Sequence, residues 1–285
     1  PEVLIAEMDY AGVDMGVLHT YPTLGRPDFL NRYLGEAVRR FPDRLVRLIA
    51  VKEASIPKDP NGAIQELEEQ LRIGGGVGIQ FVPGFYYRPT DGVQAGHEAP
   101  WDDGALRPFW EKVASTGLPV YFTMSGAVRG GTASVQARQD AYMGEQRILM
   151  RWMERYPNTT VVVTHGLPWG LFIEENRVRI PDRMFEMFEN ARCNLQMLFP
   201  IGLGARWEYP WKETEPAVQQ LVERIGADRL IWGTDIPMVG RYCTYRQALD
   251  QFRVHCEFLT DSQRADIIGG TAARIIEVAK LAKSG

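Results

Sequence analysis

Two stretches of the chain have the sequences Val161-Val-Val-Thr-His165-Gly-Leu-Pro168 and Leu230-Ile-Trp-Gly-Thr-Asp235-Ile-Pro237. Each contains β-branched and aliphatic residues typical of a buried strand in a parallel sheet, and each ends on one ionisable side chain that Gly or Pro follows. Because an imidazole or a carboxylate is costly to bury without partners, we expect both side chains to face a polar cavity. In parallel α/β proteins that cavity lies at the carboxyl edge of the sheet.

Strand-like and helix-like segments alternate along the whole chain. After a helix at 2–11, we predict strands at 13–18, 45–51, 77–82, 118–124, 160–165, 192–198 and 229–235. Helices are predicted between them, at 29–41, 61–73, 105–116, 141–156, 181–190 and 215–225, and two more follow the last strand. This repeated order predicts parallel strands joined by right-handed crossovers.

The seven predicted strands are one fewer than a closed (β/α)8 barrel needs. We therefore predict a single barrel domain over residues 1–285. We expect strand one, which lies before Pro1 or is donated by another chain, to pair between the first and last predicted strands. The alternative is an open doubly wound sheet, which normally has a glycine-rich phosphate loop after a strand. The run Gly74-Gly-Gly-Val-Gly78 comes before a strand instead, which favours the barrel.

The composition excludes several classes of partner. Hydrophobic residues make up 45% and charged residues 24% of the chain, and the formal net charge is −4. Since Lys and Arg form no block, we expect no nucleic-acid surface and no binding to anionic membranes. No stretch has the ~20 apolar residues of a membrane span. The three cysteines form no C-x-x-C pair, which is typical of a reducing compartment, so we predict a cytoplasmic protein that acts on small molecules.

Aromatic residues and arginines recur in the loops after the predicted strands. The segments are Phe85-Tyr-Tyr-Arg88, Trp169, Arg206-Trp-Glu-Tyr-Pro-Trp211 and Arg241-Tyr-Cys-Thr-Tyr-Arg246. Rings offer flat apolar walls and Arg offers a planar fork, so we predict a site for an aromatic or cyclic carboxylic acid. The predicted substrate-binding residues are Arg88, Trp169, Arg241 and Tyr245. The alternative is that these side chains pack loops onto the barrel rim or onto a second copy of the chain, and we expect a homo-dimer or higher homo-oligomer.

Five segments together resemble one known family. They are Met8-Asp-Tyr-Ala-Gly-Val-Asp14, Ala37-Val-Arg-Arg-Phe-Pro-Asp-Arg44, Gly117-Leu-Pro-Val120, Thr164-His-Gly166 and Trp232-Gly-Thr-Asp-Ile-Pro237. Their order and spacing are similar to the amidohydrolase-related family, which contains metal-dependent hydrolases and non-oxidative decarboxylases similar to aminocarboxymuconate-semialdehyde decarboxylase. The resemblance implies a TIM barrel with a divalent metal at its carboxyl end. In that family the metal is bound by a His-x-His pair on strand one, a His on strand five and an Asp on strand eight, and a His on strand six lies beside it.

Carried over to this chain, the resemblance assigns His165 to the strand-six His and Asp235 to the strand-eight Asp. It implies that both are catalytic and that Asp235 also binds the metal, Zn or Mn. The strand-five position holds Thr123, and because a neutral hydroxyl is a weak Zn²⁺ ligand we place Thr123 among the substrate-binding residues instead. His19 ends the first predicted strand and is our candidate for a replacement metal ligand. A bound metal therefore depends on the strand-one pair expected before Pro1.

Three functions fit these residues. The first is a metal-dependent hydrolase or a non-oxidative decarboxylase that acts on a small organic acid. The second is a metal-independent, lactonase-like hydrolase, which the presence of Thr123 in place of the strand-five His favours. The third is a binding or scaffold barrel without catalysis, in which His165 bonds to backbone and Asp235 caps a turn.

Overall fold

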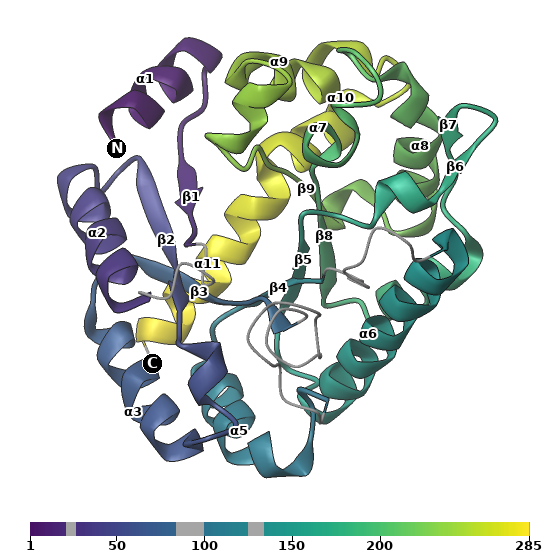
Figure 1. Cartoon of the computed structure of the whole chain (residues 1–285). Coiled ribbons are helices and arrows are strands. Elements are labelled where there is room, and N and C mark those ends of the chain that lie inside the picture. The colour runs from purple at the N-terminus through teal and green to yellow at the C-terminus, as the bar shows by residue number, and fades with distance from the viewer. Residues whose placement is uncertain (21–26, 84–99, 125–133, 285) are drawn as a thin grey trace.

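The computed structural model describes residues 1–20, 27–83, 100–124 and 134–284. Seven parallel strands form one curled sheet in the order β1-β2-β3-β4-β5-β8-β9 (Figure 1). Their bounds are β1 Gly16–Leu18, β2 Leu45–Ala50, β3 Gly76–Phe81, β4 Val120–Thr123, β5 Val161–Thr164, β8 Cys193–Met197 and β9 Leu230–Trp232. Each of these seven strands lies at or within one residue of a predicted segment, and the predicted α/β barrel architecture is confirmed.

Helices cover the outside of the curled sheet. The α-helices are α1 Glu2–Ala11, α2 Pro27–Arg40, α3 Pro60–Arg72, α5 Arg107–Ser115, α6 Val135–Arg155, α7 Phe199–Leu203, α8 Glu215–Arg224, α9 Tyr245–Asp250, α10 Asp261–Ala265 and α11 Thr271–Ser284. The helix predicted at 181–190 is the 3-10 helix η5 (Asp182–Glu189), and a short hairpin, β6 (Ile173–Glu174) and β7 (Arg177–Val178), precedes it. None of the described helices is long and apolar enough to cross a membrane.

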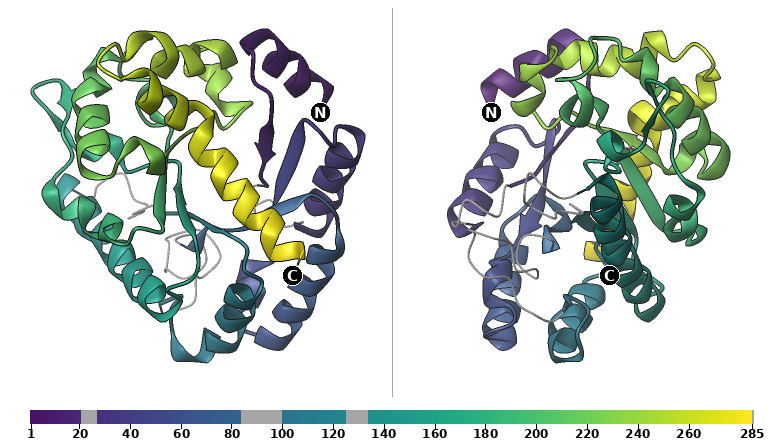
Figure 2. Two further views of the ribbon diagram at one scale, coloured as in Figure 1. Left: turned by 180° about the vertical axis from the view of Figure 1, so that it is seen from behind. Right: turned by 45° about the vertical axis from the view of Figure 1, so that its right-hand side comes forward.

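β1 and β9 are the two edges of the sheet. They are not paired with each other, and no strand in the described part of the chain lies between them. The eighth strand that the sequence places there stays a prediction. Behind the sheet, as Figure 2 shows, α11 crosses the amino end of the strands, where Ala282 approaches Gly117 just before β4. The opposite, carboxyl end of the strands faces the viewer of Figure 1.

The two faces of the sheet differ in chemistry. Phe122 of β4 faces the helices, and its ring lies 5.2 Å from the ring of Trp152 on α6. Neighbouring residues of a strand face opposite sides, so Thr123 faces the barrel interior. Thr123 is in register with Thr164 of β5, and Gln196 of β8 is next in the same row. The interior is therefore polar where the strands end, while the outer face around β4 is apolar.

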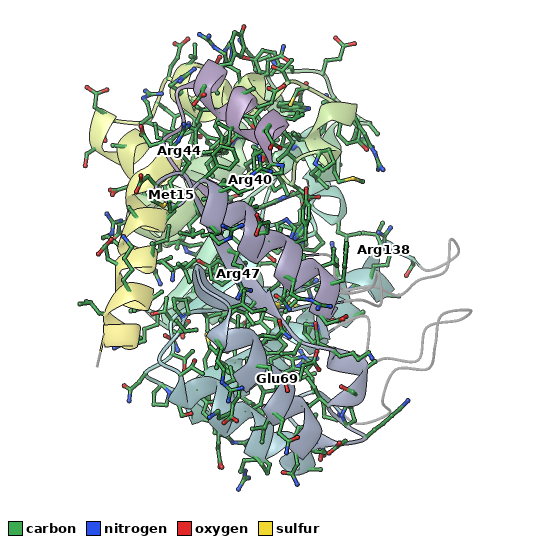
Figure 3. All side chains as sticks on the ribbon, turned by 90° about the vertical axis from the view of Figure 1, so that its left-hand side faces the viewer. Met15, Arg40, Arg44, Arg47, Glu69 and Arg138 are labelled. Atoms are coloured by element: carbon green, nitrogen blue, oxygen red, sulfur yellow. The ribbon has the colours of Figure 1, made fainter. Side chains whose placement is uncertain are left out.

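A buried arginine joins two helices to β2. Arg47, labelled in Figure 3, is wholly buried. Its guanidinium donates hydrogen bonds at 2.6–3.1 Å to Asn31 Oδ1 and to the carbonyl oxygens of Gly74, Gln70 and Ile73. Burial lowers the pKa of Arg47 to about 10. The side chain stays charged at neutral pH and ties α2 and the end of α3 to the sheet.

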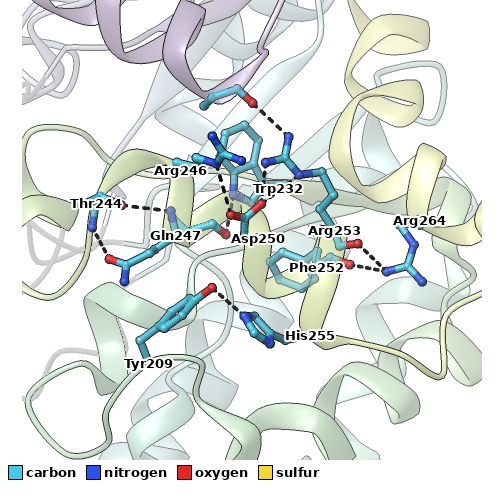
Figure 4. A network of polar contacts seen from close by, with 12 residues as sticks. Tyr209, Trp232, Thr244, Arg246, Gln247, Asp250, Phe252, Arg253, His255 and Arg264 are labelled. Atoms are coloured by element: carbon cyan, nitrogen blue, oxygen red, sulfur yellow. Dashed lines mark hydrogen bonds and ion pairs between the residues drawn. The ribbon is translucent and has the colours of Figure 1, made fainter.

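A second polar network joins the first and last parts of the chain. Arg253, in the π-helix Gln251–His255, donates to the Ala11 carbonyl oxygen at 2.9 Å and to Asp250 at 2.5 Å (Figure 4). His255 lies 2.6 Å from the Tyr209 hydroxyl in the same view. This network lies in the outer helical layer and connects α1 to α9.

Candidate active site

His165 and Asp235 lie at the carboxyl ends of β5 and β9, as predicted. Both have left-handed backbone conformations, with φ of 61° and 52°. Such conformations are uncommon for residues other than Gly and cost of order 1–3 kcal/mol, so they persist where the surrounding structure enforces them. They concentrate at functional sites, which is consistent with a functional role for both side chains.

Two imidazoles contact the two oxygens of Asp235. His165 Nε2 lies 3.6 Å from Oδ2, and His19 Nε2 lies 3.3 Å from Oδ1. The two rings are nearly perpendicular, with centroids 6.1 Å apart. All three side chains are partly exposed, at 18% to 31%. The structure thus brings together the predicted pair and His19, which follows β1 on the other edge of the sheet.

Asp235 is a carboxylate at neutral pH. Burial alone would raise the pKa of Asp235, but hydrogen bonds and charge from His165 and His19 outweigh it and hold the pKa well below its usual range. The carboxylate can therefore stabilise a protonated imidazole or accept a proton from water.

A backbone carbonyl orients the ring of His19. Its Nδ1 lies 3.2 Å from the Thr20 carbonyl oxygen, which only accepts hydrogen bonds, so we assign a proton to Nδ1. The shorter contact decides this assignment, because Gln80 Nε2, an amide donor buried on β3, also lies 3.5 Å from the same nitrogen. His19 Nε2 then points at Asp235, and this contact is favourable when a proton or another cation lies between the two atoms.

The described residues do not form a complete metal site by themselves. No group of three or more His, Cys, Asp or Glu side chains among them is arranged to hold a metal ion. His19 and Asp235 present one nitrogen and one oxygen side by side. Thr123 ends β4, which corresponds to strand five of the family. Its hydroxyl lies 2.6 Å from the Thr164 hydroxyl and is hydrogen-bonded to it.

A hollow of about 320 Å³ opens beside His165. Polar and apolar surface contribute about equally to its walls, and its lining is Met124, Arg138, His165, Gly166, Leu167, Pro168, Trp169, Gly170, Leu171, Ile201 and Gly202. Trp169 is 2% exposed and packs 4.5 Å from the Phe199 ring. Its indole lies over Gly166, where an added Cβ would be 2.3 Å from the ring. Trp169 is therefore a fixed wall of the hollow, and its role in substrate binding stays a prediction.

The other predicted substrate-binding residues do not join this group. Arg88 lies outside the described residues. Arg241 ends the 3-10 helix Met238–Arg241 and is exposed. Tyr245 is 6% exposed and packs 5.5 Å from the Trp232 ring in a cluster with Met8 of α1. The structure thus corrects the prediction for Tyr245, because its ring is buried in the outer helical layer.

Two residues near His165 and Asp235 were not predicted from the sequence. Arg138 of α6 reaches the hollow, but an exposed arginine on a helix carries no signal of such a role. Gln196 accepts a hydrogen bond from the His165 backbone N–H at 2.9 Å. A lone polar residue near the end of the apolar segment Leu195-Gln-Met-Leu198 was a signal that could have identified it.

Several solved structures share the fold. A 2,6-dihydroxybenzoate decarboxylase, complexed with 2,6-dihydroxybenzoate, is 18% identical with a TM-score of 0.69 over 97% of this chain and 88% of that chain. A 5-carboxyvanillate decarboxylase from Sphingomonas paucimobilis is 18% identical, with a TM-score of 0.65 over 96% and 82%. A dihydroxybenzoic acid decarboxylase from Polaromonas, with bound manganese and the inhibitor 2-nitroresorcinol, is 18% identical, with a TM-score of 0.66 over 97% and 86%. At this identity the likeness shows the fold alone.

The sequence itself identifies the family. No curated protein matches the chain. The sequence model of the amidohydrolases, however, matches residues 6–278 and so spans every strand as well as His19, His165 and Asp235. This match confirms the resemblance drawn from the five segments, and the protein belongs to the amidohydrolase family.

Proposed function

We propose that this amidohydrolase-family protein is an enzyme that decarboxylates a small aromatic carboxylic acid. One observation carries the proposal: His165 contacts the Asp235 carboxylate with Nε2 and also lines the hollow beside the strand ends. A proton-transfer pair therefore adjoins a space that suits a small ring. The decarboxylases that share the fold agree with this choice of reaction.

The lining of the hollow favours an aromatic anion. Its volume of about 320 Å³ is at the lower end of the range for small-molecule sites and suits a single substituted ring. Trp169 and Leu171 offer apolar walls, and Arg138 offers a permanent positive charge. Among the described residues that line the hollow, none is Asp or Glu, so a substrate carboxylate meets no like charge there.

Proton delivery is the step that these residues supply. When the bond between the ring and the carboxylate breaks, CO₂ leaves and the electron pair stays on the ring carbon, which must take up one proton. His165 is the proton donor in this proposal, and Asp235 stabilises its protonated form. His19 contacts the other oxygen of Asp235 and holds the carboxylate in place. Solvent returns the proton to His165, so each turnover consumes one acid anion and one proton.

No step of this proposal uses a metal, because the described residues do not fit a metal site by themselves. The Polaromonas decarboxylase is described with bound manganese. Parallel assays with Mn²⁺, with Zn²⁺ and with a chelator therefore belong to the test. If activity requires either metal, we infer that residues outside the described part of the chain supply a further ligand and that Asp235 and His19 lie beside the metal.

Hydrolysis of a cyclic ester is the second candidate. The observation that favours it is the hydroxyl of Thr123, paired with Thr164, where the family has an imidazole. Asp235, kept ionised by its two histidines, would then take a proton from the attacking water. The product would be a hydroxy acid, with no release of CO₂.

The test is an assay that separates the two reactions. The 285-residue chain is incubated with 2,6-dihydroxybenzoate and other hydroxybenzoates labelled with ¹³C in the carboxylate, and with a panel of aromatic lactones. Labelled CO₂ that disappears in His165→Asn supports decarboxylation, whereas opened lactone supports the second candidate. Arg138→Met is expected to raise KM, and Arg147→Met, an exposed arginine on the same helix, is the matched control. No turnover of any acid or lactone would contradict both candidates.

A further inference from the structure

One glutamine touches both segments that carry the reactive pair. Gln196 lies on β8, the strand between β5 and β9. Its Oε1 accepts the hydrogen bond from the His165 backbone N–H at 2.9 Å. Its Nε2 lies against Gly233, two residues before Asp235, where an added Cβ would be 2.2 Å from this nitrogen. A single amide group therefore contacts the backbone on both sides of the site.

Both segments need such support. His165 and Asp235 have φ of 61° and 52°, in the region that L-residues other than Gly seldom occupy. A residue in this strained conformation after a strand relaxes unless neighbouring groups hold its backbone in place. The Gln196 amide accepts the hydrogen bond from the His165 N–H. Because Gly233 has no side chain, the same amide can also lie close to the Gly233 backbone.

We propose that Gln196 is a positioning residue that sets the separation between His165 and Asp235. It acts through the His165 N–H bond on one side and through packing on Gly233 on the other. The inference deepens the proposed function and rests on it, because it assumes that His165 and Asp235 form the reacting pair. Gln196 itself neither donates nor accepts the transferred proton.

The variants separate the hydrogen bond from the bulk of the side chain. Gln196→Met keeps the length but removes the acceptor, and Gln196→Glu keeps an acceptor oxygen. Gly233→Ala pushes the amide away from the other side. The matched control is Asn194→Leu, which removes an amide from the same face of β8 at its amino end, where Asn194 donates to the Val161 carbonyl oxygen.

The kinetic expectation is a loss of kcat with little change in KM. A misplacement of about 1 Å costs roughly a hundredfold in rate, so Gln196→Met and Gly233→Ala are expected to lower kcat on labelled 2,6-dihydroxybenzoate by about tenfold to a hundredfold. Gln196→Glu is expected to recover most of the rate, and Asn194→Leu to keep kcat. An equal loss in Asn194→Leu, or an unchanged kcat in Gln196→Met, would overturn the inference.

A structural readout keeps the inference testable apart from activity. Crystal structures of the wild type and of Gln196→Met give the separation between His165 Nε2 and Asp235 Oδ2, which is 3.6 Å here. We expect it to lengthen by about 1 Å in Gln196→Met, so that the two side chains no longer form an ion pair, and to stay the same in Asn194→Leu. If the wild type turns over no substrate, the proposed function fails, and the crystal structures still decide the role of Gln196. An unchanged separation in Gln196→Met would refute that role.

Discussion

Replacing Asp235 with Asn removes one negative charge and nearly keeps the shape of the side chain. The carboxylate lies 3.3 Å from His19 Nε2 and 3.6 Å from His165 Nε2, and 18% of the side chain is exposed. With an effective dielectric constant of about 20, a charge at such a distance stabilises an imidazolium by about 4 to 5 kcal/mol. The Asn carbonyl recovers part of this energy as a neutral hydrogen bond, which leaves a loss of at least about 2 kcal/mol.

This loss acts on the protonated His165 that the proposed reaction needs. At about 1.4 kcal/mol for each factor of ten, kcat is expected to fall between about 30-fold and about 1,000-fold. The assay is release of labelled CO₂ from a ¹³C-carboxylate substrate under steady-state conditions. Asp250→Asn is the matched control, because Asp250 is 17% exposed and paired with Arg253 in the outer helical layer. A kcat for Asp235→Asn equal to that of Asp250→Asn would refute the role assigned to the carboxylate.

Three further substitutions test the surroundings of the site and the fold. Gly166→Ala is expected to lower the free energy of unfolding by more than about 1 kcal/mol in urea titrations, because the φ of 78° disfavours Ala and the new Cβ meets Trp169. Arg47→Met removes the guanidinium that donates to the Gly74 and Ile73 carbonyl oxygens and is expected to cost about 3 kcal/mol or more, whereas the exposed Arg40→Met should cost less than about 0.5 kcal/mol. Burial raises the pKa of Glu53 from 4.5 to about 8. Between these two pH values the folded state keeps the Glu53 proton, whereas the unfolded state has released it. Relative to Glu53→Gln, the wild type is therefore expected to lose up to about 5 kcal/mol of stability as the pH rises from about 4.5 to 8, and parallel urea titrations across this range would show a constant difference if the reasoning is wrong.

The strands were predictable because short runs of apolar residues in the local sequence indicate that they are buried. A segment such as Val161-Val-Val-Thr164 has no polar side to expose, so only a strand covered on both faces suits it. The same logic located His165 and Asp235, since each is the first ionisable residue after such a segment. The helix predicted at 181–190 is a 3-10 helix instead, and no side chain caps its first turn.

The directions of side chains in the loops were not predictable in the same way. Trp169 and Tyr245 both follow strands and were given the same role, yet only Trp169 lines the hollow. Tyr245 turns outward because α9 packs on α1, which is a contact between distant parts of the chain. Arg138 reaches the hollow through the same kind of long-range arrangement. Local pattern fixes which residues end a strand, and tertiary packing decides which loop residues meet them.

The same packing determines which histidine is firmly tied to Asp235. His165 and Asp235 follow β5 and β9, which are joined through β8 by continuous strand pairing and through the Gln196 amide. His19 follows β1, which shares no strand hydrogen bonds with β9 in the described chain. Across that edge, the attachment of α1 to α9, in which Arg253 donates to the Ala11 carbonyl oxygen, supports its 3.3 Å contact with Asp235. A proton donor must keep its place through turnover, and by this criterion His165 is better suited to that role than His19.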